Sequence, residues 1–597
     1  MNSPEKAFSL HQNNQFDEAE KIYLALLEVE PENPVIIYAM GLLLYQTSRI
    51  DEACSYLKKI PRLRPESGLL TDAFNLLGEI YFVKQDIKEA AKYFSAVLEE
   101  DPSNFAANYY CGKIHLLMEN PDGALNYFLK ALDTDQNQAS LYNDMIQAYS
   151  KTDNIQGAIK CLNKLTEIEP DNPEHYFNLG LYCSRKGDAD GTYRAFTGAI
   201  ALKPDFAAAH INLAVLHQKL NRFENAEKHY LKALELNDNH PDAYVGLGKT
   251  YFDLGNPLKA IDISRKGLQK FPENSKLYFN ISKAHFMLEN LDEGWEYFRL
   301  RRMLNEKKGL KTYLLDFNGQ LNDKKILVYW DCGYGDSIQF LRYIPLLAEK
   351  CAEVLFSVQE PLINLVKDSN LGATILSSAQ KSEEIDYDFQ INLTSLAYLF
   401  KTGINNFPFK EKYINSNPQK AARWKEKYFN NDGFNVGIVW HSHVNSLRKN
   451  IEDVKLFYKM SKTGGINLYS LQQTRGLPLY DGMPEDFKLI RLGDELKDFS
   501  DTAAVIENLD LLIAIDTAAA HLAGAMGRPV YCLIPHNPNW RWFMSGENSQ
   551  WHEKTPWYDS MKLFRQKEAG NWKEVIDRVE NDLLLNKSEF IPAQIQP

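Results

Sequence analysis

LLIAIDTAAAHLAGAMGRPVYCLIP, residues 511–535, is the stretch that decides the fold of the second half of the chain. Residues 511–515 form an unbroken apolar run, as in a parallel strand that is buried on both faces. Residues 530–534 form a second run of this kind, and the segment between the two has the length and the small residues of a helix. The stretch therefore predicts a strand, a helix and a second strand of an α/β domain with a parallel sheet.

The end of the first of these strands has the features of an anion site. Asp516 and Thr517 follow the strand, and the helix begins with Ala518 and Ala519, so that no bulky side chain covers its free N–H groups. A phosphate group binds well at such a position because the N–H groups and the positive end of the helix dipole face it. His521 lies one turn into the helix. The same residues also fit an ordinary crossover helix in which Thr517 is only the N-cap.

A second polar strand end follows the apolar segment KKILVYW, residues 324–330. The next loop contains Gly333 and Gly335, which allow a tight turn before Asp336 and a helix with apolar residues at helical spacing. Ligands of open α/β sheets bind at the carboxyl ends of the strands, so Asp336 is suitably placed for a base. The loop lacks the G-K-[ST] ending and the full G-x-G-x-x-G pattern, which argues against ATP or NAD binding through those motifs.

The second half of the chain has the pattern of two α/β lobes. Apolar strands alternate with helices over this half, and a new series begins with the strand at 436–440. We therefore expect a linker at 305–322, a first Rossmann-like lobe at 323–425 and a second one, ending in a helix, at 426–597.

The first half of the chain, residues 1–304, is predicted to be an array of about nine helical repeats. A small residue recurs at a spacing of 34 residues, with one step of 37, and an aromatic residue or leucine follows four residues later in all but one unit. The small residues are Ala19, Ala53, Ala90, Ala124, Ala158, Thr192, Ala226, Ala260 and Gly294. This pattern resembles the tetratricopeptide repeat. Neighbouring helical pairs then stack into a right-handed superhelix with a concave groove. The longer step places an insertion at 66–71, which we expect to lengthen a turn.

Asparagine recurs at one position in the first helix of several repeats. These residues are Asn178, Asn212 and Asn280, at spacings of 34 and 68. Residues in register along a solenoid lie on one face, so their amides are predicted to form a ladder in the groove that binds the backbone of a peptide. The chain is similar here to the O-linked N-acetylglucosamine transferases, which hold extended acceptor proteins in this way. The alternative is that these are solvated surface amides, since other units have Tyr110, Asp144 and Gly246 at the same place.

Five motifs of the second half occur together and in a fixed order. They are GYGDSIQFLRYIPLL, VGIVW, SLQQ, DFSDTAAVIENLDLLIAIDTAAAHLAGAMGRPVYCLIP and NWRW. Over residues 320–570 the chain thereby resembles the bacterial glycosyltransferases that carry tetratricopeptide repeats and are related to the lipopolysaccharide heptosyltransferases. The resemblance implies a GT-B fold, in which two Rossmann-like lobes face each other across a cleft that holds a nucleotide sugar. The expected fold class is an α-helical repeat superhelix followed by an α/β module of this type.

The resemblance also implies roles for individual residues. The Gly-Asp pair of the first loop carries the catalytic carboxylate in the heptosyltransferases, which assigns the base to Asp336. Their Asp-Thr-Gly-x-x-His element binds the donor diphosphate and corresponds to Asp516, Thr517, Ala518 and His521, with alanine in place of the glycine. The helix N–H groups and the Thr517 hydroxyl would stabilise the negative charge of the departing phosphate.

Other residues of the second lobe complete the expected donor site. A basic residue of this lobe usually helps to neutralise the leaving diphosphate, and Arg448 or Lys449 is the candidate. Trp440, Ser470 and Gln472 lie at predicted strand ends and are assigned to nucleoside contacts.

No metal ion is expected to take part. The chain has no D-x-D motif at a strand end to hold a divalent ion. His441 and His443, spaced by one residue, resemble a partial zinc site, but no third ligand accompanies them, and we interpret them as polar groups of the cleft or the surface. The resemblance to these glycosyltransferases implies a nucleotide sugar as substrate, a CMP- or UDP-sugar by analogy, and no cofactor.

Composition and charge exclude several classes of protein. A net charge of -12 argues against general binding of nucleic acids, which needs clustered Lys and Arg. The seven cysteines are scattered and form no C-x-x-C pair, which is typical of a reducing cytosol. The chain has no apolar run of the length of a membrane span and no signal-peptide pattern at its start. We therefore expect a cytoplasmic protein.

The leading hypothesis is a cytoplasmic protein O-glycosyltransferase. The repeats would recruit a polypeptide acceptor, for which flagellin is the first candidate by analogy, and the second half would move a sugar to its Ser or Thr hydroxyl. A first alternative is a heptosyltransferase-like enzyme that acts on a glycan or a lipid-linked acceptor. A second is a repeat scaffold whose transferase module has lost activity. The sequence leaves the stereochemical outcome and the oligomeric state open.

Overall fold

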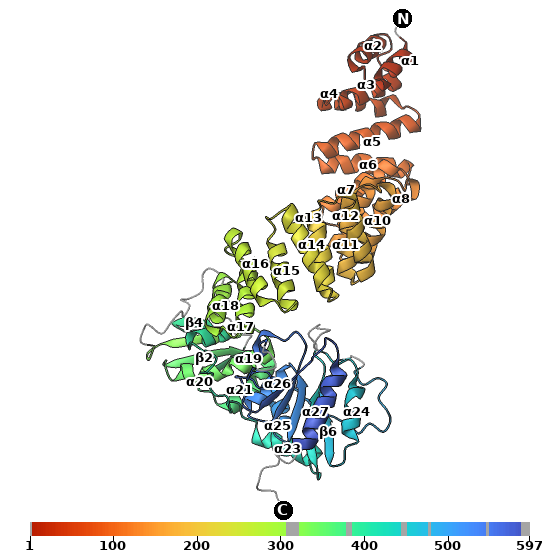
Figure 1. The fold of residues 1–597 in the computed structure, drawn as a ribbon. Helices are drawn as coiled ribbons and strands as arrows, with labels where there is room; N and C mark the ends of the chain where they lie inside the picture. Colours follow the sequence, from red (N-terminus) through yellow and green to blue (C-terminus); the bar gives the residue numbers. More distant parts are fainter. Residues whose placement is uncertain are drawn as a thin grey trace, which may run out of the picture. The chain divides into compact units, whose positions relative to one another are not determined.

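The computed structural model of the chain, shown in Figure 1, describes residues 3–305, 321–377, 385–442, 450–475, 479–544 and 549–586. It divides into two compact units, Met1–Leu220 and Asn221–Pro597. The first unit consists of repeat helices, and the second holds the last repeat helices together with two parallel sheets.

The described part of the first unit is built from helices that pack in sequential pairs. They are α1 (Pro4–Gln12), α2 (Phe16–Val29), α3 (Pro34–Gln46), α4 (Ile50–Leu57), α5 (Ser67–Val83), α6 (Ile87–Glu100), α7 (Phe105–Leu117), α8 (Pro121–Thr134), α9 (Ala139–Lys151), α10 (Ile155–Ile168), α11 (Pro173–Lys186), α12 (Ala189–Leu202) and α13 (Ala207–Lys219). Asparagine and aspartate begin many of them: the Asn104 side chain, for example, accepts a hydrogen bond from the Ala107 N–H.

The repeated small and aromatic residues form the contacts within each pair. Ala124 on α8 is fully buried, and so is Phe128, one turn later. The Phe128 ring packs against α7 at Gly112, where an added Cβ atom would lie 2.4 Å from a ring carbon. The same contact joins Phe94 to Gly78. The recurring small and aromatic residues are therefore buried between paired helices, with a glycine opposite the ring where the helices approach closely, and the helical repeats are confirmed.

The insertion in the third repeat lies in a helix and not in a turn. After α4 the chain forms a short 3-10 helix, η1 (Ile60–Leu63), and then begins α5 at Ser67. Helix α5 has 17 residues, whereas α7 at the same position of the next repeat has 13. The expectation of a longer turn at 66–71 was therefore wrong, because those residues extend the first turns of α5.

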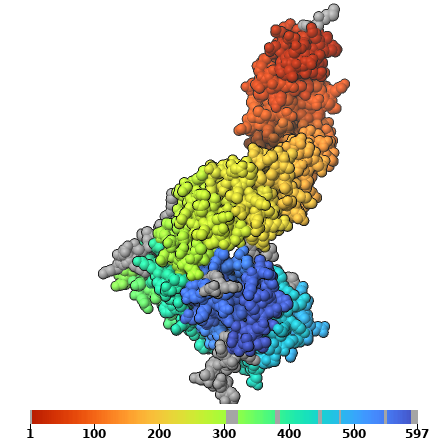
Figure 2. All heavy atoms as spheres, viewed as in Figure 1, coloured from red at the N-terminus to blue at the C-terminus, as the bar shows by residue number. Residues whose placement is uncertain are grey.

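The second unit begins with the last repeat helices. They are α14 (Phe223–Leu236), α15 (Pro241–Asp253), α16 (Pro257–Lys270), α17 (Ser275–Met287) and α18 (Leu291–Asn305). Space-filling Figure 2 shows this part in yellow-green, lying directly against the green and blue α/β part. Trp295 on α18 is buried at this contact and donates a hydrogen bond from its indole N–H to the Thr402 carbonyl, 2.8 Å away.

A four-stranded parallel sheet forms the first lobe. Its strands are β1 (Lys325–Tyr329), β2 (Glu353–Val358), β3 (Thr374–Ser377) and β4 (Phe389–Asn392), in the order β3-β2-β1-β4. The helices of this lobe are α19 (Tyr334–Phe340), η2 (Leu341–Tyr343), α20 (Ile344–Ala348), η3 (Glu360–Leu362), α21 (Ile363–Ser369), η5 (Leu393–Ser395) and α22 (Leu396–Leu399).

A six-stranded parallel sheet forms the second lobe. Its strands are β5 (Phe434–Val439), β6 (Ile466–Ser470), β7 (Ile490–Arg491), β8 (Leu511–Ile515), β9 (Val530–Ile534) and β10 (Met561–Arg565), in the order β10-β9-β8-β5-β6-β7. The helices are α23 (Pro418–Tyr428), η6 (Val454–Phe457), α24 (Tyr458–Ser461), η7 (Gly493–Glu495), α25 (Phe499–Ile506), α26 (Ala518–Ala525), η8 (Trp540–Trp542) and α27 (Trp572–Asn586). All five residues of β8 are buried, as the apolar run predicts for a central parallel strand.

Both sheets reverse their strand order at the first strand of the lobe. In the first lobe β1 lies between β2 and β4, and in the second β5 lies between β6 and β8. Each reversal opens a crevice at the carboxyl ends of two adjacent strands, where open α/β sheets bind ligands. The α/β character of the second half is thus confirmed.

Helix α27 belongs to the second lobe alone. Val575, Ile576 and Val579 are buried in the same apolar core as β5, β8 and β9. Among the described residues, no helix is both long enough and apolar enough to cross a membrane.

Candidate active site

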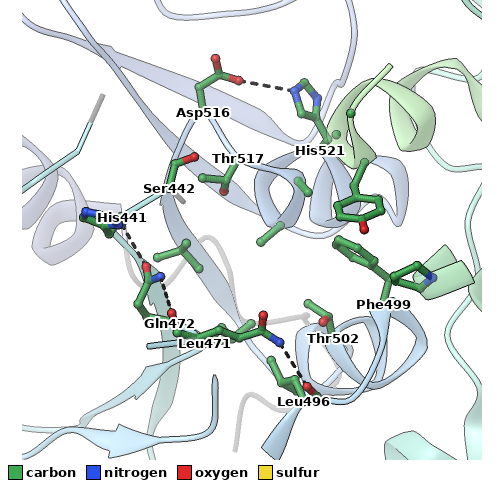
Figure 3. A pocket seen from close by; sticks show the side chains of 18 of the residues that line it. His441, Ser442, Leu471, Gln472, Leu496, Phe499, Thr502, Asp516, Thr517 and His521 are labelled. Atoms are coloured by element: carbon green, nitrogen blue, oxygen red, sulfur yellow. Dashed lines mark hydrogen bonds and ion pairs between the residues drawn. The ribbon is translucent and has the colours of Figure 1, made fainter. Parts of the chain in front are cut away.

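A cavity of about 490 Å³ lies at the carboxyl ends of the strands of both lobes. The first lobe contributes the loop after β1, from Gly333 to Asp336. In Figure 3 the second lobe surrounds the cavity with Asp516, Thr517 and His521 on one side and with Leu471 and Gln472 on another. The two strand ends singled out in the sequence therefore face one cavity.

The N-terminus of α26 is open toward this cavity. Thr517 occupies the N-cap position, but its side chain makes no capping bond, because its hydroxyl donates to the Ile515 carbonyl at 3.1 Å. Ala518 and Ala519 line the cavity and are only half-buried. The first N–H groups of a helix have no partner within the helix, so they are available to an anionic ligand here.

His521 is buried behind this helix terminus. Its Nε2 lies 3.5 Å from the Asp516 carboxylate, and its Nδ1 is 3.1 Å from the Tyr558 hydroxyl. The ring also stacks on Trp542, with centroids 5.5 Å apart. These contacts hold the imidazole in one orientation at the edge of the cavity.

The loop after β1 reaches α26 directly because Gly335 has no side chain. A Cβ atom at Gly335 would lie 3.1 Å from Cδ2 of His521 and 3.4 Å from Cα of Ala518. Helices α19 and α26 therefore meet near their N-termini, across the boundary between the lobes.

Asp336 forms an ion pair with Arg541, a residue of η8 in the second lobe. The Asp336 side chain is 29% exposed in the cavity, whereas that of Arg541 is 9% exposed. Arg541 donates to Oε1 of Gln339 at 2.6 Å and to Oδ1 of Asn539 at 2.8 Å, and its guanidinium lies 4.2 Å from the centre of the Trp540 ring. Burial lowers the pKa of Arg541 to about 10, so it stays cationic at neutral pH.

Buried hydrogen bonds hold the Asp336 loop in place. The Asp331 carboxylate, which follows β1, accepts from Nδ2 of Asn392, the last residue of β4, at 3.0 Å and from the Thr394 hydroxyl at 2.7 Å. The Ser337 hydroxyl donates to Gln359, whose Nε2 donates to the Cys332 carbonyl at 2.9 Å. The loop is therefore anchored to both neighbours of β1.

Gln472 and His441 form the polar wall at the ends of β6 and β5. Oε1 of Gln472 accepts from the His441 N–H at 3.0 Å, and Nε2 of His441 is 2.9 Å from Nδ2 of Asn450. Both residues line the cavity, as expected for Gln472 from the sequence. His443 lies outside the described residues, and no cluster of three potential metal ligands occurs among those that are described.

Trp440 and Ser470 lie beneath the cavity and do not line it. Trp440 is fully buried and packs edge-on against Tyr480, with centroids 5.5 Å apart. Ser470 is also buried, and its hydroxyl is 2.8 Å from that of Tyr480. The assignment of these two side chains to nucleoside contacts is thus not met in this arrangement, because both point into the core of the lobe.

Three described cations of the second lobe line the cavity. Arg448 and Lys449 lie outside the described residues. Arg475 and Lys497 line the cavity in addition to Arg541, and both are exposed. Sequence reasoning did not select these three residues. The signal for Arg541 was present in NWRW, where an arginine between two tryptophans follows the end of β9.

The three repeat asparagines have different surroundings. Asn178 on α11 is exposed, and Asn212 on α13 donates to its own helix at the Ala208 carbonyl, 2.9 Å away. Asn280 on α17 is buried, and its Nδ2 donates to the Val245 carbonyl at 2.9 Å. The amide of Asn280 thus joins two neighbouring repeats.

Comparisons with known proteins identify the repeats. Family models described as tetratricopeptide repeat match residues 7–67, 84–143, 116–179 and 205–273. The chain therefore contains tetratricopeptide repeats.

Protein FlbA of Caulobacter vibrioides is 23% identical over 329 residues. The match comprises 50% of this chain and 53% of FlbA, so the chain spans about half the length of this relative. Among solved structures, MamA is 25% identical and covers 29% of this chain and 93% of its own, with a TM-score of 0.27. The C-terminal part of a repeat protein from Cytophaga hutchinsonii is 16% identical and covers 41% of this chain and 98% of its own, with a TM-score of 0.36.

Proposed function

We propose that this protein is a glycosyltransferase of GT-B architecture that transfers a sugar from a nucleotide donor to Ser or Thr of a polypeptide. The observation that carries the proposal is the single cavity that holds both the Asp336 carboxylate and the open N-terminus of α26. A base and an anion site in one cavity are the two groups that glycosyl transfer to a hydroxyl needs.

The donor phosphates bind at the N-terminus of α26. The N–H groups of Ala518 and Ala519 and the helix dipole attract the negative charge there. Arg475 and Lys497 of the same cavity add positive charge toward the phosphates. Gln472 and His441, on the polar wall, are the closest candidates for contacts to the nucleoside. A CMP- or UDP-sugar fits this chemistry.

In the transfer step the acceptor hydroxyl oxygen bonds to the anomeric carbon as the bond from that carbon to the phosphate oxygen breaks. The hydroxyl proton moves to the Asp336 carboxylate, and the phosphate leaves with the bonding electrons. Arg541 stabilises the ionised form of Asp336, which is the form that a base needs. The α26 N–H groups stabilise the charge that develops on the phosphate, and no step requires a metal ion.

The repeats supply the acceptor in this proposal. Helices α15, α17 and α18 pack against the lobes within the same compact unit, so a polypeptide held by the last repeats is delivered beside Asp336. Flagellin is the first acceptor to test, on the strength of the sequence resemblance to repeat-containing glycosyltransferases.

Substitution of the base provides the decisive experiment. The full chain is co-expressed with flagellin, and the sugar adduct is quantified by intact-mass spectrometry for the natural chain and for Asp336→Asn. We expect the variant to lose roughly 10²–10⁴-fold in rate, the usual contribution of a general base. Asp486→Asn, which alters an exposed carboxylate on the surface of the second lobe, is the matched control.

Nucleotide binding is measured on the same proteins. UDP, GDP, ADP and CMP are compared by thermal shift, since a nucleotide that binds the folded state raises the melting temperature. Asp336→Asn should keep this shift because its side chain does not belong to the phosphate site. An adduct that forms undiminished in Asp336→Asn contradicts the proposed base. Absence of a shift with every nucleotide and sugar nucleotide contradicts the donor site.

A further inference from the structure

A second cavity, of about 360 Å³, adjoins the active site on the side of the repeats. Helices α15, α17 and α18 form one wall. The other wall is formed by residues that follow β1 and β4 in the first lobe and by residues 539–541 of the second lobe. The two cavities share Asp336, Asn539 and Arg541. Among the described residues, none from α26 lines the second cavity, so it is separate from the proposed phosphate site.

Positive charge is concentrated in this second cavity. Four cationic and two acidic side chains line it, which gives a net charge of +2 in a chain whose net charge is -12. The cations are Lys249, Lys283, Arg301 and Arg541, and the acids are Asp253 and Asp336. Lys249 pairs with Asp253 at 3.0 Å, and Arg541 pairs with Asp336.

Lys283 is not neutralised by a pair of this kind. Its ammonium lies 4.7 Å from the centre of the Phe252 ring and 4.8 Å from that of Phe279, and no described carboxylate lies within ion-pair distance. The guanidinium of Arg301 also lies over the Phe279 ring, 4.2 Å from the ring centre. The aromatic rings orient the Lys283 ammonium but leave its hydrogen-bonding capacity toward the cavity.

The position of Lys283 in the repeat is also informative. Lys249 and Lys283 are 34 residues apart, so they occupy the same place in α15 and α17 of successive repeats. Residues in register along such an array follow one face of it. The face of the repeats that carries these two lysines therefore borders the cavity that Asp336 also lines.

We propose that the second cavity binds an acidic side chain of the acceptor polypeptide, an Asp or Glu close in sequence to the modified Ser or Thr. This inference rests on the proposed transferase function and specifies its acceptor. The carboxylate binds Lys283, with Arg301 beside it, while the acceptor hydroxyl reaches Asp336 at the other end of the same cavity. A cavity of this volume is roughly 9 Å across, which corresponds to about three residues of extended chain.

A polypeptide is the occupant that this location favours. The wall that carries Lys283 and Arg301 is formed by repeat helices, whereas the proposed donor phosphates bind at α26 in the other cavity. The carboxylate of an acidic donor sugar is the competing occupant, and it is tested separately.

Peptide binding to the full chain tests the proposal without any transfer reaction. The probes are fluorescein-labelled peptides with one central Ser in a Gly/Ala background and a single Glu at each position within three residues on either side. Each is paired with the peptide that has Gln at that position. We expect at least one Glu peptide to bind about tenfold more tightly than its Gln partner, as one charge-assisted hydrogen bond provides. Fluorescence anisotropy gives the affinities.

Variants of the lysine locate the effect. Lys283→Gln should bring the Glu/Gln affinity ratio close to one, and Lys283→Arg should retain most of it. Lys266→Gln, on the exposed side of α16, is the matched control and should leave the ratio unchanged. Unchanged thermal shifts with nucleotide show that each variant is folded, and if Lys283→Gln fails this check, Lys283→Met takes its place.

Three results overturn the inference. The first is equal affinity for Glu and Gln peptides at every position in the natural chain. The second is a Glu preference that survives the loss of Lys283. The third is Lys283-dependent binding of free glucuronate or N-acetylneuraminate without any Glu preference, which assigns the cavity to the donor sugar. If the chain prefers the Glu peptide but has no transferase activity, the peptide site is supported and only the proposed function is contradicted.

Discussion

Gly335 lies where the loop after β1 of the first lobe meets α26 of the second lobe. A hypothetical Cβ at this position would lie 3.1 Å from Cδ2 of His521 and 3.4 Å from Cα of Ala518, so an added methyl group fits only if its neighbours move by a few tenths of an ångström. The Ala518 atom belongs to the backbone of α26 and cannot rotate away. The absence of a side chain lets the Asp336 loop approach the N-terminus of α26 at the cavity that both line.

Gly335→Ala should weaken nucleotide binding. Overpacking of this kind costs about 1–3 kcal/mol, and relief of the clash moves α19 away from α26, so we expect the affinity for the preferred nucleotide to fall roughly tenfold in isothermal titration calorimetry. Gly464→Ala is the control, because nothing lies within 4 Å of an added Cβ there. Equal affinities for both variants would show that the close approach of the helices is not needed for binding.

The charge of Lys283 depends on pH above neutrality. Burial lowers its pKa to about 8, below the ordinary value of a lysine, so the ammonium is present below pH 8 and is lost as the pH rises through that value. The charged groups that face it are Lys249, Asp253, Arg301, Asp336 and Arg541. We therefore expect the affinity for the preferred Glu peptide to fall about tenfold between pH 7 and 9.5. The matched Gln peptide serves as the control, and a flat profile for both contradicts the role of Lys283.

The N-terminus of α26 has no side-chain cap, whereas that of α16 has one. Asn256 begins α16 with a side-chain bond to the Lys259 N–H, which satisfies one of the free groups of that helix. Thr517 makes no such bond, and its helix terminus faces a cavity. A helix end left open in this way is suited to a ligand rather than to stability.

Thr517→Ala should therefore separate binding from stability. The substitution removes no capping bond, so we expect the melting temperature of the ligand-free chain to stay within the error of the measurement while the nucleotide-induced shift decreases. Asn256→Ala should show the reverse, with a loss of about 1 kcal/mol of unfolding free energy and a normal nucleotide shift. A large loss of stability in Thr517→Ala would show that its hydroxyl supports the fold.

On the scale of the whole molecule, the last repeats and the two lobes form one core. Trp295 of α18 packs edge-on against Phe340, Trp540 and Trp557, with ring centroids 5.8 to 6.5 Å apart. Phe286 of α17 stacks on Trp540 as well. These rings belong to one cluster of buried residues that extends from the repeats into both lobes.

Truncation distinguishes this core from the rest of the array. A fragment of residues 221–597 should unfold cooperatively and bind nucleotide, because it corresponds to one compact unit. A fragment of residues 306–597 exposes the rings that α17 and α18 cover, each worth about 1.5–3 kcal/mol when buried, and should melt at a lower temperature or aggregate. Calorimetry with and without nucleotide measures both, and equal melting temperatures would show that the last repeats do not stabilise the lobes.

Secondary-structure elements with periodic burial could be predicted from the sequence alone. The recurring small and aromatic residues predicted the helical pairs, since each is needed at every contact between helices, and the run at 511–515 predicted a buried central strand. Asp336 and Thr517 were selected because each follows a predicted strand near a helix N-terminus, where open α/β sheets bind ligands.

Contacts between residues far apart in the sequence became known only from the tertiary structure. The pairing of Asp336 with Arg541 and the approach of Lys283 to the active site depend on how η8 and α17 pack against the lobes. Trp440 and Ser470 do not line the cavity because Tyr480 packs against both of them. The sequence could not show this contact, since it depends on the fold of the segment that carries Tyr480. Local sequence patterns reveal which residues are buried, but the partner of a buried or charged group is set by the packing of elements far apart in the chain.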